Sequence, residues 1–400
     1  MKILHTSDWH LGHNLYGYDR KKDHIDFLNQ LRAIIKEEIP DALLVSGDIH
    51  DVSNPPTNIV SIFNDFILKL RHEFPLMAII ITAGNHDSAS KVEVYREVWK
   101  ELDIDVIGKI EKNGRDYSFK NNLIEVKGKG VIVAIPFVNR AYMSVGSEEN
   151  IPEENFFSQI AKEVSNEIHD NLPIVLMAHI TVNGSDTEGH KQPSIGNINS
   201  VNDSIFDKMF DYVALGHIHK SQTVDSFGRI RYSGSPIAIS FDEEFTHSVS
   251  IVEIEKGIRP VIRTVNIEPS RPLITFPTKP VSFGNAIKML KKFPSEKECF
   301  IRLNVEQEAD LPADCEEQAI AAVTDKKCLY CTIKYLRPNK ENSLSERFDL
   351  RLDDFMDLRP TDVAMTLFKS LGIGEETSKE LQILIKEIEE DIINKQRGED

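Results

Sequence analysis

The sequence predicts an α/β protein with two domains and a helical tail. Short apolar runs alternate with amphipathic helical patterns over the first 270 residues, and a shorter series of strands and helices follows a polar turn bracketed by Pro269 and Pro272. A length of 400 residues suits two or three domains. We therefore expect a first domain at residues 1–270, a small α/β domain at 271–338 and helices at 343–396.

The first domain shows buried-strand patterns with two clear helices between them. The first helix ends before Pro40 and has an apolar face formed by Ile25, Leu28, Leu31 and Ile35. The second helix has a similar face formed by Ile59, Ile62, Phe63, Phe66 and Leu70. The expected strands are 2–5, 42–46, 77–83, 130–136, 174–178, 212–215 and 230–233. A hairpin of 247–255 and 261–267 follows, around Lys256 and Gly257.

The small domain is expected to contain strands and helices in alternation, at 273–276, 283–293, 300–305, 316–323 and 329–336. Residues 338–342 form a linker. Helix starts in the tail are indicated by the capping boxes Ser343 with Glu346 and Thr377 with Glu380. The last helix has an apolar stripe of Leu381, Leu384, Ile385, Ile388 and Ile392. This stripe either packs on its own domain or docks a partner helix.

The composition restricts the classes of function. An apolar fraction of 40% and a charged fraction of 28% are typical of soluble globular proteins. Because the first residues do not form a signal peptide and no apolar run reaches a membrane span, we expect a cytoplasmic protein without membrane contact. The net charge of −17 argues against a broad basic surface that coats nucleic acid. A nucleic-acid phosphate would have to be met locally by metal ions, with a partner supplying much of the grip.

Two of the four cysteines, Cys328 and Cys331, form a C-x-x-C motif. They lie in an expected strand, where side chains three residues apart point to opposite faces. A structural or incidental role is therefore favoured over a metal site.

Five short polar motifs directly follow expected strands, where ligand sites gather in sheets covered by helices. They are Asp8-Trp9-His10, Gly47-Asp48, Gly84-Asn85-His86-Asp87, His179 and Gly216-His217-Ile218-His219. Residues two apart, such as Asp8 and His10, project to the same side of an extended chain. Imidazole and carboxylate without thiolate suit a pair of borderline divalent cations such as Mn²⁺. Asp48, alone in its motif, is the expected bridge between the two ions.

The motif order D-x-H, G-D-x-x-D, G-N-H-D, H, G-H-x-H resembles that of the calcineurin-like metallophosphoesterases. The segments ILHTSDWHLG, AGNHDS, LGHIHKSQ and YSGSPIAISFDE further resemble the SbcD family, the nuclease subunits of bacterial SbcCD complexes, most strongly over residues 1–250. The resemblance implies an α/β fold of two facing mixed β-sheets flanked by helices, followed along the chain by a small α/β capping domain and C-terminal helices. It also relates the chain to double-strand-break repair nucleases.

The resemblance also implies roles for single residues. One metal ion would be held by Asp8, His10, Asp48 and His219, and the second by Asp48, Asn85, His179 and His217. His86 takes the position of the catalytic histidine. Asp51 stands where archaeal relatives carry a histidine, and in the wider superfamily such an aspartate partners the catalytic histidine. The neighbouring His50 is read as a non-ligand.

The activity implied is Mn²⁺-dependent 3′-to-5′ exonuclease and endonuclease cleavage of DNA ends and hairpins. It would work with an SbcC-type, SMC-like ATPase bound through the C-terminal helices, in a complex where this chain is a homodimer. The alternative is a small-substrate enzyme of the same superfamily, a phosphomonoesterase or cyclic-nucleotide phosphodiesterase. A non-catalytic scaffold is disfavoured because all seven presumed ligands and His86 are present.

Candidate contacts to the DNA backbone follow the first metal motif, at His13, Arg20, Lys21 and Lys22. The last three open a helix, so an ordinary solvated face is the competing interpretation.

Overall fold

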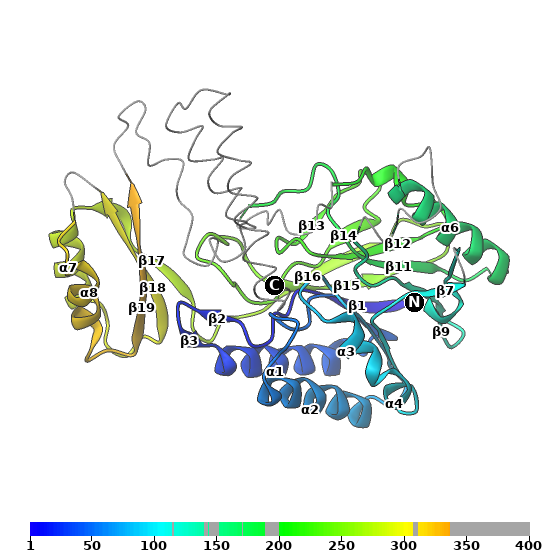
Figure 1. Cartoon of the computed structure of the whole chain (residues 1–400), viewed down its shortest axis with the longest axis horizontal. Coiled ribbons are helices and arrows are strands. Elements are labelled where there is room, and N and C mark those ends of the chain that lie inside the picture. The colour runs from blue at the N-terminus through cyan, green and yellow to red at the C-terminus, as the bar shows by residue number, and fades with distance from the viewer. Residues whose placement is uncertain are drawn as a thin grey trace, which may run out of the picture. The chain divides into compact units, whose positions relative to one another are not determined.

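The computed structural model describes residues 1–113, 116–139, 143, 152–169, 171–188, 200–306 and 311–336 (Figure 1). The chain forms two compact units, residues 1–305 with 310–335, and residues 306–309 with 336–400. Every feature below belongs to the first unit. The predicted linker at 338–342 and the tail helices at 343–396 lie outside the described residues.

The first large sheet has six strands, in the order β16-β15-β1-β4-β5-β6. Its parallel strands are β1 (Lys2–Thr6), β4 (Ala42–Ser46), β5 (Ala78–Thr82) and β6 (Ile104–Ile107). The sequence predicted the hairpin of β15 (Ser248–Glu253) and β16 (Val261–Asn266), and in the structure this hairpin joins the sheet antiparallel through β1.

Helices α1 (Lys21–Glu38) and α2 (Thr57–Glu73) cover the outer face of this sheet. Their buried residues recur every three or four positions, and they pack against outward-facing strand residues such as Leu4 and Val45. Helix α1 ends because Ile39 takes a left-handed conformation and Pro40 cannot continue the helix. These contacts fix the strand ends from which the loops of the site emerge.

The second large sheet also has six strands, in the order β13-β14-β12-β11-β10-β9. Parallel strands β10 (Gly130–Ala134), β11 (Ile174–His179), β12 (Tyr212–Gly216) and β14 (Ile230–Tyr232) form its centre. The edge strands β9 (Leu123–Val126) and β13 (Gln222–Thr223) are antiparallel. Helix α6 (Pro152–Glu167) covers the outer face with Phe156, Phe157, Ile160 and Val164.

A shared core joins the inner faces of the two sheets. Ile3 and Leu44 of the first sheet lie in one fully buried cluster with Val175, Met177 and Tyr212 of the second. Figure 1 shows α1 and α2 on the side of the sandwich opposite to α6. The predicted fold of two facing mixed sheets flanked by helices is therefore confirmed.

A three-stranded sheet of β17 (Leu273–Val281), β18 (Cys299–Glu306) and β19 (Cys328–Leu336) follows. Helices α7 (Phe283–Lys291) and α8 (Cys315–Val323) pack on one face of it. Cys328 lies in the core on that face, whereas Cys331 packs beside Leu15 and Phe241 on the other. All four cysteines are free thiols. The boundary between the two domains at residue 270 stays a prediction.

Several elements have no counterpart in the sequence prediction. Besides β6, β9, β13 and α6, they are β2 (Asn14–Leu15), β3 (Tyr18–Asp19), β7 (Glu111–Asn113), β8 (Asp116–Ser118), α3 (Ala89–Val94), α4 (Arg96–Lys100) and the 3₁₀ turns η1 (Lys120–Asn122) and η2 (Asp203–Ile205). Most are too short for a readable period. Among the helices of the described residues, none has the length and apolar character needed to cross a membrane.

Candidate metal centre

The five polar motifs meet at one edge of the sandwich. They follow the carboxyl ends of β1, β4 and β5 in the first sheet and of β11 and β12 in the second. Parallel strands end on the same side, so their loops converge there. The structure brings all seven predicted ligands into two adjoining clusters.

Main-chain hydrogen bonds join the loops after β1 and β4. The amide of Asp8 donates to the carbonyl of Gly47 (3.0 Å), and that of His10 donates to Asp48 (3.1 Å). Positive φ angles occur at Asp8 (53°), His10 (43°), Asp48 (50°) and His217 (99°). Each such conformation of a non-glycine residue costs about 1–3 kcal/mol and persists only where the surroundings enforce it. Strain is thus concentrated on four of the predicted ligands.

Two glycines allow the loops to approach closely. A Cβ atom at Gly216 would lie 1.8 Å from the carbonyl oxygen of Ser46, on the facing sheet. A Cβ atom at Gly84 would lie 2.1 Å from Oδ1 of Asp48. Neither separation is sterically possible, so any side chain at these positions would push a predicted ligand out of place.

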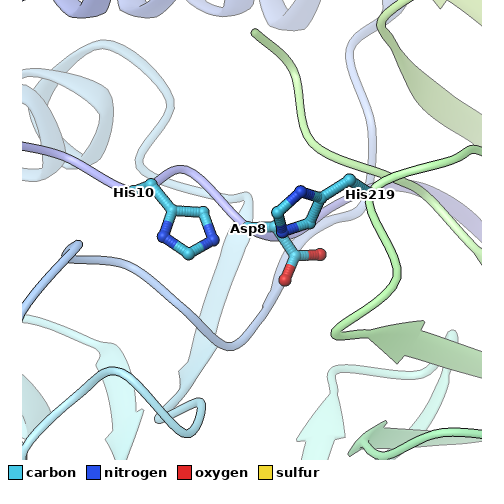
Figure 2. A group of neighbouring side chains, drawn as sticks. All are labelled: Asp8, His10 and His219. Carbon is cyan, nitrogen blue, oxygen red and sulfur yellow. The ribbon is translucent and has the colours of Figure 1, made fainter. Parts of the chain in front are cut away.

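The first cluster consists of Asp8, His10 and His219, whose donor atoms lie within 4.8 Å of one another. Figure 2 shows the Asp8 carboxylate beside the ring of His219, with the ring of His10 next to them. All three residues are buried. Nδ1 of His219 contacts Oε1 of Glu243 at 2.8 Å, and the Asp8 carboxylate accepts a hydrogen bond from the amide of His217 at 3.0 Å.

The second cluster consists of Asp48, His179 and His217, with the same limit of 4.8 Å. Nδ1 of His179 donates to the carbonyl of Ser46 (2.9 Å), which turns Nε2 toward the cluster. The side-chain oxygen of Asn85 lies 2.9 Å from that Nε2 and 3.0 Å from Nδ1 of His217.

Asp48 connects the two clusters. Its Oδ2 lies 3.8 Å from Nε2 of His10 and 3.4 Å from Nε2 of His179. A carboxylate between two sets of donors is the natural bridge for a pair of ions. Its Oδ1 accepts a hydrogen bond from the amide of His86 (2.9 Å), which fixes its orientation.

The electrostatics of the centre favour cations. Burial lowers the pKa of His10, but the hydrogen bond with Asp51 and the carboxylates of Asp48 and Asp8 outweigh it and raise that pKa to about 9. Burial also lowers the pKa of His179, and the Asp48 carboxylate again prevails and raises it to about 9. Among the described residues, no lysine or arginine pairs with Asp8 or Asp48.

The donors fit two divalent cations. Nε2 of His10 is buried and has no hydrogen-bond partner within the described part of the chain, although it lies in a centre of carboxylates. A metal ion would satisfy this nitrogen, and it would compensate the buried carboxylates of Asp8 and Asp48, with which no lysine or arginine of the described residues pairs. Imidazole, carboxylate and amide oxygen together suit Mn²⁺ and related ions.

His86 lies beside the first cluster, with its ring centroid 4.9 Å from that of His10. Its Nδ1 donates to the main-chain oxygen of Asp51 at 2.8 Å. The carboxylate of Asp51 instead contacts Nδ1 of His10 at 3.2 Å. Asp51 therefore contacts His86 through its main-chain oxygen and not through its side chain, as had been predicted. The carboxylate of Asp51 contacts the ring of His10 instead.

Two carboxylates that support the metal centre were not predicted from the sequence. Asp87 accepts hydrogen bonds from the amides of Ile49, His50 and Gly84. Glu243 contacts Nδ1 of His219 and also accepts a hydrogen bond from the amide of Ile239 (3.1 Å). Both residues stand inside motifs that carry the family resemblance, G-N-H-D and SFDE, and this was the available signal. His50, read as a non-ligand, contacts Asp87 and the ring of Phe63.

The predicted DNA contacts are not brought together as one surface. Arg20 is only 2% exposed, and its guanidinium pairs with Asp23 and lies over the ring of Phe300. This position does not fit a phosphate contact, because the charge is already paired and buried. His13 is partly buried, and this burial lowers its pKa to about 4. Lys21 and Lys22 are exposed, and Lys22 pairs with Glu298.

Comparisons with known proteins show which family the chain is similar to. The model of the calcineurin-like phosphoesterase family matches residues 1–221. The SbcD protein of the nuclease SbcCD from Rhodobacter capsulatus is 30% identical over 295 residues, which is 70% of this chain and 72% of that protein. A solved structure of a dimetal phosphatase from Danio rerio covers 66% of this chain and 98% of its own, with a TM-score of 0.36 and 11% identity.

Proposed function

The chain belongs to the calcineurin-like phosphoesterase family and, within it, to the family of SbcCD nuclease subunits, and from this premise we propose that it is a two-metal nuclease that hydrolyses phosphodiester bonds in DNA. The observation that carries the proposal is the position of Asp48 between two clusters of donors. The name of the Rhodobacter capsulatus relative supports nucleic acid as the substrate. Cleavage would be 3′-to-5′ exonucleolytic and endonucleolytic, on DNA ends and hairpins.

We assign the ligands by cluster. Asp8, His10, Asp48 and His219 would hold one ion, and Asp48, Asn85, His179 and His217 would hold the other. A pair of divalent cations held there, such as Mn²⁺, would supply Lewis-acid activation of water and compensation of the phosphate charge.

His86 is the proposed general acid. Because the carbonyl of Asp51 can only accept a hydrogen bond, Nδ1 of His86 carries a proton and Nε2 is left to exchange one with the substrate. The protonated ring then donates from Nε2 to the departing sugar oxygen. Asp51 acts as a positioning residue for this ring and, through its carboxylate, for His10.

The charge of the chain bears on its partners. A net charge of −17 opposes tight binding of DNA by this chain alone, so we propose that an SbcC-type ATPase, bound through the C-terminal helices, supplies much of the grip. We also propose a homodimer. Exposed apolar side chains at the junction of α3 and α4 support it, since Val94 is 69%, Tyr95 between the helices 61% and Val98 60% exposed. Sedimentation of Tyr95→Glu beside the unaltered protein tests this surface, and a mass that remains dimeric in the variant would exclude it.

The decisive experiment measures Mn²⁺-dependent cleavage of a hairpin DNA, with and without an SbcC-type ATPase. A nitrophenyl phosphodiester serves as the small substrate, and His86→Ala serves as a variant that keeps all seven ligands. We expect cleavage of the hairpin, stimulation by ATP and the partner, and loss of activity in the variant. Hydrolysis of the small ester with none of the DNA would instead favour the small-substrate phosphoesterase.

A further inference from the structure

A polar cavity of about 460 Å³ has a lining that is separate from the metal centre. It opens at the edge of the sandwich, between the β13–β14 edge of one sheet and β16 of the other, and its lining contains none of the predicted ligands. Two arginines, Arg231 and Arg259, line it together with the hydroxyls of Thr223 and Thr264.

Arg231 is a buried cation that lines this cavity. It is 8% exposed, and its guanidinium donates to three hydroxyls, those of Ser250 (3.0 Å), Thr223 (3.1 Å) and Ser221 (2.7 Å). No carboxylate of the described residues forms an ion pair with it. Burial lowers the pKa of the guanidinium. Three of its five N–H groups are used, and all three face neutral acceptors.

The rest of the cavity wall does not supply the missing negative charge. Asp225 is the acidic residue of the lining, but its Oδ2 lies 3.6 Å from Nε of Arg229 and its Oδ1 accepts the amide of Ile230. Arg259 is exposed and forms no ion pair with any described carboxylate, so it adds a second uncompensated charge. By contrast, Arg263 on the neighbouring β16 points to the other face of the strand and pairs with Glu38.

We propose that this cavity binds a small phosphate-bearing anion, either inorganic phosphate or the phosphate of a mononucleotide. Guanidinium groups bind phosphate oxygens in pairs, and hydroxyls complete such sites at short range. The volume falls within the range of about 300–1,000 Å³ that is usual for small-ligand pockets. The anion would supply the counter-charge that Arg231 and Arg259 lack.

The test uses the full-length protein with its metal ions removed by EDTA, so that phosphate cannot bind at the metal centre. Calorimetric titrations with inorganic phosphate and with deoxyadenosine monophosphate, at constant ionic strength, separate the two sources. We expect Arg259→Gln to weaken binding about tenfold, as loss of one charge-assisted contact requires. Arg263→Gln is the matched control, an arginine of the same hairpin with a partner of its own, and it should bind as the unaltered protein does.

Each result decides something. Phosphate and the mononucleotide binding equally would identify the anion alone as the ligand, whereas tighter binding of the mononucleotide would add its sugar and base. The proposal is overturned if neither binds, if Arg259→Gln binds both as well as the unaltered protein, or if Arg259→Gln weakens binding of duplex DNA only. Because no metal is present in this assay, failure here leaves the nuclease proposal intact.

Discussion

Asp87 offers the sharpest test of how the metal centre is built. Its side chain is fully buried, and its two oxygens accept three main-chain amides from two loops. Oδ2 accepts Ile49 (3.0 Å) and Gly84 (2.9 Å), while Oδ1 accepts His50 (3.0 Å). Asp87 therefore ties the loop after β4, which carries Asp48, to the loop after β5.

Replacing Asp87 by Asn leaves the shape almost unchanged, so the effect is electrostatic. The amide oxygen can keep the two bonds of Oδ2, but the amide NH₂ then faces the N–H of His50, which is left without an acceptor. A buried N–H without a partner costs about 1–3 kcal/mol, and each of the two remaining bonds loses about 1 kcal/mol with the charge. Relief from burying a carboxylate offsets part of this sum. We expect a net loss of about 2–4 kcal/mol in the free energy of unfolding.

Urea unfolding of the metal-free protein, followed by tryptophan fluorescence, measures this loss. Of the two tryptophans, Trp9 lies in the core of the first sheet and Trp99 is partly buried against that core, so the signal reports on the unfolding of this part of the protein. Asp65→Asn, the same change on the exposed face of α2, is the control and should alter stability by less than about 0.5 kcal/mol. If Asp87→Asn unfolds at the same urea concentration as the control and binds Mn²⁺ with unchanged affinity, the role given to Asp87 is wrong.

Three further predictions concern the chemistry and the pH dependence. His86→Ala should lower the rate of DNA cleavage by roughly a hundredfold or more, while its metal content stays near that of the unaltered protein. Asp8→Ala should instead lower the metal content. Elemental analysis of both variants, together with the DNA assay, separates the two roles. Glu243→Gln should weaken Mn²⁺ binding about 10- to 100-fold in a calorimetric titration, because the neutral amide no longer fixes and polarises His219, and unchanged affinity would dismiss this role. Burial lowers the pKa of His24 to about 3, below its unfolded value of about 6.5, so the unfolded state takes up the proton first as pH falls and stability is lost from pH 6.5 downward. Between pH 7 and pH 5 this loss amounts to about 2 kcal/mol of the free energy of unfolding. In EDTA, the free energy of unfolding of His24→Leu should therefore fall by that much less over the same pH range. An equal fall in the variant and the unaltered protein would refute the assignment.

The sequence was sufficient for the strands that position the site, because β4, β5, β11 and β12 are apolar up to their last residue, whereas β1 has only Ile3 and Leu4 as its apolar centre. Strands buried on both faces need such runs, and a polar residue directly after one must lie at the edge of the sheet. The edge strand β9 was missed, since its residues are only partly buried and show no clear alternation. Helix α6 has the helical period at Phe156, Ile160 and Val164, and that signal was available but not used.

Metal ligands can be recognised in the sequence more readily than the residues that hydrogen-bond to them. A ligand must be of one of a few types and must follow a strand, and those two conditions together made the motifs recognisable. A support such as Glu243 needs only an oxygen at the right place, and that place depends on a loop far along the chain. Arg20 shows the same limit in reverse. Next to two lysines it resembled part of a solvated basic face, yet it pairs with Asp23, three residues further along the chain, and lies over the ring of Phe300 from the distant strand β18.

The metal centre and the edge cavity carry charges of opposite sign, and this sets their chemistry apart. At the metal centre, buried carboxylates without a lysine or arginine of the described residues beside them require cations, so an anionic substrate can approach only after the ions are in place. At the edge cavity, Arg231 and Arg259 already offer positive charge and need no metal to attract an anion. Phosphate binding that persists in EDTA therefore belongs to the cavity, whereas phosphate binding that appears only with Mn²⁺ belongs to the centre around Asp48. Titrating the unaltered protein with phosphate in both conditions assigns each binding event to its site without any substitution.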